Sequence, residues 1–146
     1  MKINLYTLVV FTLLITACSQ NPIPKSQSIP KAQAPIKANL ELAEKIQAAL
    51  QSNQAVDQST AVVLNKDISV AIKISGFNRL RLKQIRNEVH NKINQLTSED
   101  YFIHVTTDKR LFRDLRKIAN QLQKTNGTAS PEIQEQVEIL NKDMAG

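Results

Sequence analysis

The segment STAVVLNKDISVAIKIS (residues 59–75) holds two apolar runs separated by a short polar stretch. In the second run, branched apolar residues occupy alternate positions, as in a β-strand with one apolar face. These residues are Ile68, Val70, Ile72 and Ile74, and the other face carries Ser69, Lys73 and Ser75. The polar stretch Asn65–Asp67 suits a tight turn between two strands. The segment therefore predicts a β-hairpin.

Amphipathic helices are predicted on both sides of this hairpin in the sequence. Before it, NLELAEKIQAALQ (residues 39–51) begins with Asn39, a favourable N-cap, and its apolar residues recur at helical spacing. After it, LRLKQIRNEVHNKINQL (residues 80–96) carries a single apolar stripe. The residues of this stripe are Leu82, Ile85, Val89, Ile93 and Leu96.

The C-terminal half predicts one more strand and two more helices. YFIHV (residues 101–105) suits a short strand, and Thr107 or Asp108 can cap the helix KRLFRDLRKIANQLQK that follows it. A last helix begins near Ser130. The predicted order is helix-strand-strand-helix-strand-helix plus a C-terminal tail helix. This order indicates an α+β fold, with a small three-stranded sheet covered by helices.

The N-terminal sequence MKINLYTLVVFTLLITAC (residues 1–18) has the features of an export signal. Its apolar run, Leu5 to Ala17, is shorter than the about 20 residues of a membrane span. The run ends in ITAC (residues 15–18), which resembles the bacterial lipobox. We predict that residues 1–17 are a signal peptide and that Cys18 becomes lipidated. The alternatives are an ordinary signal peptide with a chance cysteine and an uncleaved anchor.

Composition divides the remainder of the chain into three regions. Residues 18–38 hold the lipidated cysteine and four of the five prolines, with Ser, Gln and Lys between them. This composition is typical of an extended spacer, although an irregular packed arm is the alternative. Residues 39–125 form the predicted αβ domain, and residues 126–146 form a linker and the tail helix. With one cysteine, the chain forms no internal disulfide, so the domain is held together by packing.

The chain is basic, with 19 Lys and Arg against 13 Asp and Glu and a formal net charge of +6. Such a balance favours anionic partners, namely lipid headgroups, wall polymers or nucleic acid. The export signal makes nucleic acid the least expected of the three, and we expect no nucleic-acid binding.

Several segments resemble the YhcN/YlaJ-type sporulation lipoproteins. They are LAEKIQAAL, VDQSTAVVLNKDISVAIKI, VHNKI and FIHVTTDKRLFRDLRKIANQL, and the lipobox adds to the likeness. In this family a short strand runs through a Thr/Ser-Asp turn into a basic helix. Here these parts are Phe102–Val105, Thr106–Asp108 and Lys109–Leu122. The family often has glycine in the hairpin and proline near the strand-to-helix turn, and this sequence has neither.

This resemblance implies a small lipoprotein of endospore-forming bacteria, attached to a spore membrane and linked to germination or outgrowth. The family supplies no agreed catalytic residues to transfer to this chain. Its small αβ domain looks similar to envelope modules that bind lipid or oligomerise, a likeness at the level of fold.

The residues themselves give little support for catalysis. No nucleophile motif and no phosphate-binding glycine loop is present in the sequence. His90 and His104 are isolated, and a metal site would require both rings together with at least one more ligand. We therefore expect no enzymatic activity, no cofactor and no metal site.

A basic constellation is the strongest candidate site. On the predicted helix of residues 109–124, Lys109, Arg113 and Lys117 recur every four residues opposite the apolar stripe, and Arg110 lies beside them. We predict that these four residues contact an anionic surface. The alternative is a solvated helix face that keeps the domain soluble.

The tail helix carries Glu132, Glu135 and Glu138 beside its own apolar stripe. It could dock on the domain and cover the basic residues, or bind a partner or a second copy of the chain. Docking of some kind is expected, because short isolated helices are marginal in water.

Together these features predict a lipid-anchored protein on the extracytoplasmic face of a bacterial membrane, and the family resemblance implies a spore membrane. Its domain acts without catalysis, through contacts with the membrane, an envelope protein or a second copy. No small-molecule substrate is evident. The alternative function is a peripheral binding module for an anionic ligand, either lipid headgroups or a wall polymer.

Overall fold

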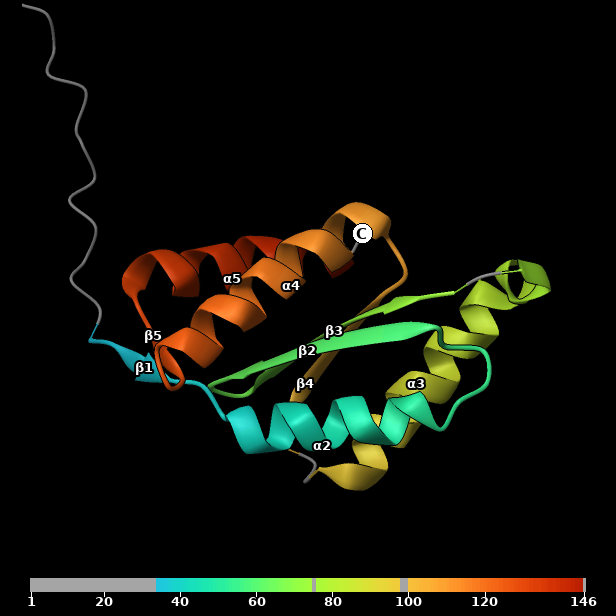
Figure 1. The fold of residues 1–146 in the computed structure, drawn as a ribbon, viewed down its shortest axis with the longest axis horizontal. Helices are drawn as coiled ribbons and strands as arrows, with labels where there is room; N and C mark the ends of the chain where they lie inside the picture. Colours follow the sequence, from blue (N-terminus) through green and yellow to red (C-terminus); the bar gives the residue numbers. More distant parts are fainter. Residues whose placement is uncertain (1–33, 75, 98–99, 146) are drawn as a thin grey trace, which may run out of the picture. The chain divides into compact units, whose positions relative to one another are not determined.

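The computed structural model describes residues 34–74, 76–97 and 100–145, which belong to one compact unit (Figure 1). Its elements are β1 (Ile36–Lys37), α2 (Leu40–Gln51), β2 (Gln58–Leu64), β3 (Asp67–Lys73), the 3₁₀-helix η1 (Gly76–Arg81), α3 (Leu82–Leu96), β4 (Phe102–Thr106), α4 (Lys109–Lys124), β5 (Thr128–Ala129) and α5 (Pro131–Ala145). The predicted order of elements and the α+β class are confirmed. The structure adds β1, β5 and η1.

The main sheet has the strand order β2-β3-β4. Strands β2 and β3 form the predicted antiparallel hairpin, in which Leu64 pairs with Asp67. Asn65 supplies the positive φ of the turn, +55°, so the hairpin closes without glycine. Strand β4 pairs in parallel with β3, because α3 carries the chain back to the end of the sheet at which β3 begins. The central strand is therefore β3.

One face of this sheet packs against α2 and α3. The predicted stripes of both helices lie here, and their central residues are almost completely buried. The cluster comprises Ala43, Ile46, Leu50, Ala61, Val63, Ile68, Val70, Ile72, Ile74, Ile85, Val89 and Ile93. The alternating isoleucines of the hairpin thus form the sheet surface against which α2 and α3 pack.

The opposite face of the sheet packs against α4 and α5, so helices cover both faces (Figure 1). The cluster on this side comprises Ala38, Val62, Leu64, Ala71, Leu111, Phe112, Leu115, Ile118, Leu122, Ala129, Ile133, Val137 and Leu140. The polar residues of β3 also point to this side. Ser69 is fully buried and donates a hydrogen bond to Asn141 Oδ1 of α5, and Lys73 Nζ lies 4.6 Å from the centroid of the Phe112 ring.

The first residues of the described unit, around β1, form hydrogen bonds with the residues around β5, just before α5. Strand β1 pairs with β5, and the Ala38 N–H donates to the Gly127 carbonyl at 2.7 Å. Gln134 of α5 donates its side-chain amide to the Ala129 carbonyl at 3.1 Å and to the Ala34 carbonyl at 3.3 Å. Residues on both sides of the predicted 39–125 range therefore belong to the packed unit.

Candidate anionic-surface contact site

Helix α4 presents the basic residues, and its start is fixed by Asp108. One carboxylate oxygen of Asp108 accepts hydrogen bonds from the backbone N–H groups of Arg110, at 2.7 Å, and Leu111, at 3.0 Å. These two hydrogen bonds lower the pKa of the Asp108 carboxyl, and the hydrogen bond from Leu111 has the larger effect. The predicted cap is therefore present, and it fixes the residue at which the helix begins.

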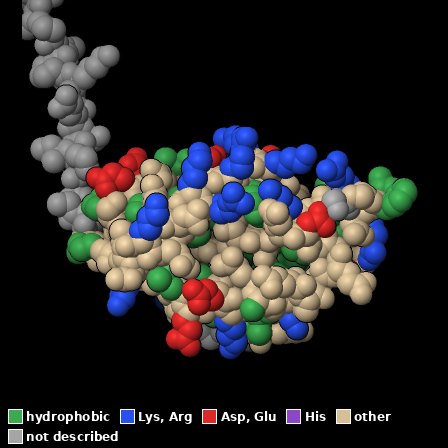
Figure 2. Space-filling model, in the orientation of Figure 1, with side chains coloured by type: hydrophobic (Ala, Val, Ile, Leu, Met, Phe, Trp, Pro, Cys, Tyr) green, Lys and Arg blue, Asp and Glu red, His purple; other side chains and the backbone are tan. Residues whose placement is uncertain are grey.

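The apolar stripe of α4 faces the sheet, which turns the predicted contact residues outward. Lys109, Arg110, Arg113 and Lys117 are all exposed. Figure 2 shows Lys and Arg side chains gathered along the side of the unit formed by α4. The structure thus brings the four predicted residues to one solvent-facing surface.

Two of these four cations have carboxylate partners. Arg110 Nη2 lies 3.0 Å from Asp143 Oδ2 of α5, and Lys117 Nζ lies 3.4 Å from Asp114 Oδ1 one helical turn away. Among the residues that the structure describes, Lys109 and Arg113 have no acidic group within ion-pair distance. Because the paired side chains remain largely exposed, each pair contributes little stability and can exchange partners.

The tail helix meets the basic surface through an ion pair with Arg110. Asp143, which the sequence pattern did not single out, is the residue of α5 that contacts Arg110. Glu138 pairs instead within α5, with Lys142 at 2.8 Å. An open groove of about 410 Å³ remains between α4 and α5, and half-exposed Ile139 is part of its lining.

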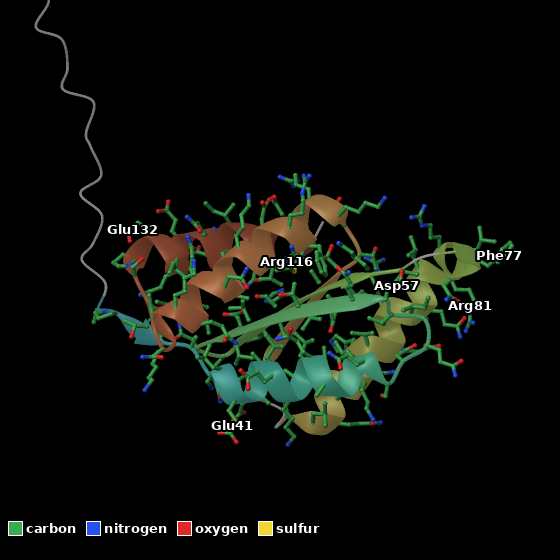
Figure 3. All side chains as sticks on the ribbon, in the orientation of Figure 1. Glu41, Asp57, Phe77, Arg81, Arg116 and Glu132 are labelled. Carbon is green, nitrogen blue, oxygen red and sulfur yellow. The ribbon has the colours of Figure 1, made fainter. Side chains whose placement is uncertain are left out.

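A second groove, of about 460 Å³, runs between α4 and the edge strand β2. Its lining contains hydroxyl, amide and cationic groups, and no carboxylate. The polar residues of the lining are Gln47, Ser59, Thr60, Arg116, Asn120, Gln123 and Lys124. Arg116, labelled in Figure 3, is a further exposed cation of α4 that the four-residue spacing leaves out, and it lines this groove together with residues of α2 and β2.

The two histidines do not form a shared site. His104 Nε2 lies 2.9 Å from Asp67 Oδ1 on the neighbouring strand, and His90 is exposed on α3. Within residues 34–74, 76–97 and 100–145, no group of three His, Cys, Asp or Glu side chains is arranged to hold a metal ion.

The predicted signal peptide of residues 1–17 and the predicted lipidation site Cys18 lie outside the described residues. In the part of the chain that is described, none of the helices has the length and apolarity required to cross a bilayer.

Comparison with known proteins identifies one family. No curated protein and no solved structure matches the chain. Residues 18–145 match the family described as sporulation lipoprotein YhcN/YlaJ, so the match begins at the cysteine of the predicted lipobox and ends with α5. A lipoprotein of this kind is attached to a membrane through lipid, on the extracytoplasmic side. The chain belongs to the YhcN/YlaJ family of sporulation lipoproteins.

Proposed function

We propose that this protein is a spore-membrane lipoprotein, anchored through acyl chains on Cys18, whose domain serves sporulation, germination or outgrowth by non-catalytic contacts. In this proposal residues 1–17 are a cleaved signal peptide. Diacylglyceryl and fatty acyl groups, such as palmitate, hold the mature N-terminus in the bilayer. The partner of the domain is an envelope protein or a second copy of the chain.

The observation that carries this proposal is the start of the family match at Cys18. A family of lipoproteins whose similarity begins at the cysteine of an ITAC sequence supports that residue as the lipid-bearing one. Several acyl chains on one residue give durable attachment, whereas a single chain is marginal.

Replacement of Cys18 tests the anchor. In the Cys18→Ser variant we expect the protein to leave the membrane fraction after a high-salt wash. The matched control is Ser19→Ala, which changes the adjacent hydroxyl and leaves the cysteine, and which should remain in the membrane. Wild-type retention of Cys18→Ser would refute lipidation at this position, and expression outside sporulating cells would refute the proposed stage.

A second candidate function is the binding of an anionic ligand, lipid headgroups or a wall polymer, by the exposed cations of α4. The specific observation in its favour is that Lys109 and Arg113 are exposed and have no acidic partner among the described residues. Basic residues close to anionic headgroups contribute about 1 kcal/mol each.

Sedimentation with phosphatidylglycerol vesicles tests this candidate, with the mature-length Cys18→Ser chain as the protein. Glutamine at Lys109, Arg110, Arg113 and Lys117 should reduce binding. Asp143→Asn should increase it, because it releases Arg110 from its ion pair. Binding should also weaken between 0.1 M and 1 M salt, as the Debye length falls from about 10 Å to about 3 Å. Equal binding by all three proteins would show that this face is only a solvated surface.

A further inference from the structure

The 3₁₀-helix η1 carries two large apolar side chains that contact almost nothing. Phe77 is 92% exposed and Leu80 is 87% exposed, the highest values among the large hydrophobic residues of the described chain. In a 3₁₀-helix, residues three apart lie on the same side, so these two side chains form one apolar tip. Figure 3 shows Phe77 pointing away from the unit at the end of η1, and Figure 2 shows an apolar projection there.

Basic residues surround this tip. Residues 76–87 contain no Asp or Glu. The exposed cations of this stretch are Arg79, Arg81, Lys83 and Arg86. Glu88 lies 3.8 Å from Arg81, and Asp57 lies beside the end of β3, where its N–H donates to the Lys73 carbonyl. Two carboxylates against four cations leave the tip positively charged.

The backbone beneath the tip is fixed by the core. Arg79 Nε donates to the Ile74 carbonyl at the end of β3, and η1 continues directly into α3, whose Ile85 and Val89 are fully buried. The two apolar side chains are therefore held out in solvent by a packed structure. Burial would stabilise them, and exposed apolar groups of this kind mark contact surfaces.

We propose that this tip, defined as η1 with Lys83 and Arg86, is a second membrane attachment of the protein. Phe77 and Leu80 insert among the lipids of an anionic bilayer, and the surrounding Arg and Lys side chains bind the phosphate headgroups. An apolar pair ringed by cations fits such a surface better than it fits a second copy of this basic chain, whose net charge of +6 would repel it.

The stretch between Cys18 and the described unit is long enough to allow this contact. Strand β1 and η1 lie at opposite ends of the described unit (Figure 1). For the tip to touch the bilayer that holds Cys18, the stretch before β1 must therefore span a distance comparable to the length of the sheet. The seven residues of β3 and the six of η1 span about 35 Å at about 3.3 Å and 2.0 Å per residue. The stretch from residue 18 to residue 34 extends to about 55 Å at most. Anchoring also raises the effective concentration of the tip at the surface.

Because the chain contains no tryptophan, one introduced indole reports on insertion. The experiment uses the full lipoprotein, purified from membranes and reconstituted into phosphatidylglycerol or phosphatidylcholine vesicles that contain brominated lipid. For Phe77→Trp in phosphatidylglycerol we expect emission at shorter wavelength and quenching by bromine. The matched control is Phe102→Trp, on an aromatic residue that is 66% exposed at the end of the sheet away from η1, and it should show neither effect.

Further variants separate the outcomes. Glutamine at Arg79, Arg81, Lys83 and Arg86 in the Phe77→Trp protein should abolish the quenching in phosphatidylglycerol. The proposal would be overturned by equal quenching of both reporters or by quenching that survives the loss of these charges. It would also be overturned by an emission shift that does not depend on lipid and grows with protein concentration.

The inference rests on the proposed anchor at Cys18, which sedimentation of the vesicles checks separately. Protein that sediments without quenching of the Phe77→Trp reporter refutes the tip contact alone. Protein that sediments with neither kind of vesicle refutes both the anchor and the tip contact.

Discussion

Gly127 precedes β5 and lies against the backbone of Ala38, which follows β1, at a point where no side chain fits. Its backbone φ is +83°, a conformation that residues with a Cβ adopt rarely. A Cβ placed here would lie 2.9 Å from the Ala38 carbonyl oxygen, and the Ala38 backbone is fixed by the hydrogen bond between its N–H and the Gly127 carbonyl. Glycine is therefore required both by conformation and by space.

We expect Gly127→Ala to lower the free energy of unfolding by about 1–3 kcal/mol, the cost of a strained backbone position. Gly76→Ala is the matched control, because Gly76 also has a positive φ, +59°, but no atom lies within 4 Å of the position that a Cβ would take there. Urea denaturation should show a smaller loss for Gly76→Ala. An equal loss in the two variants would mean that the contact with Ala38 has no energetic effect.

Asp108 gives the cap of α4 a dependence on pH. Folding lowers the pKa of this carboxyl, so its stabilising effect is complete above the unfolded pKa of about 4 and is lost as the pH falls through the folded pKa. Asp108→Asn keeps an oxygen that can accept the same backbone hydrogen bonds and removes the titration. We therefore expect the thermal unfolding temperature of the variant to fall less than that of the wild type below about pH 4. Parallel curves would contradict this expectation.

At the scale of helices and strands, periodicity predicts the long elements and misses the short ones. Helix α4 is predictable because its stripe, Leu111 to Leu122, repeats over several turns, and these residues are buried. Strands β1 and β5 have two residues each, too few for a pattern, and each forms only because packing brings the other beside it. The pattern also places residues 80 and 81 in the following helix, although they end η1.

The same limit applies to the candidate site. Spacing on one helix is sufficient to predict that Lys109, Arg113 and Lys117 share an exposed face. The ion pair of Arg110 with Asp143 could not be predicted, because it depends on how α5 packs against α4. The groove that Arg116 lines could not be predicted either, since it is completed by residues of α2 and β2.

Helix α5 supplies buried residues to the core cluster on the α4 side of the sheet, so it is an integral part of the fold. Val137 is 3% exposed within the cluster on the α4 side of the sheet. Val137→Asp should reduce the free energy of unfolding by about 3–5 kcal/mol, the range for an uncompensated buried charge. Gln136→Asp adds the same charge at the adjacent exposed position and should change stability by about 0.5 kcal/mol or less. Similar urea midpoints for the two variants would show that α5 is dispensable.

For the whole molecule, the boundaries of the folded unit follow from these contacts. Residues 39–125 lack both β1 and α5, so one face of the sheet would expose much of its apolar cluster. We expect this fragment to unfold without a cooperative transition, whereas residues 34–145 should show one in calorimetry. A sharp transition of the 39–125 fragment at the temperature of the longer one would contradict the role assigned to the terminal segments.

The pairing of β1 with β5 also bears on when the fold can be completed if the chain is exported as proposed. The first described strand acquires its partner only when residues 128 and 129 arrive, and the cluster around Phe112 is closed only by α5. Almost the entire polypeptide must therefore emerge on the far side before a complete core can exist. In the export proposed above, Cys18 would therefore emerge well before the segment that closes the cluster of α4 and α5, so the anchor would be available before the domain is complete.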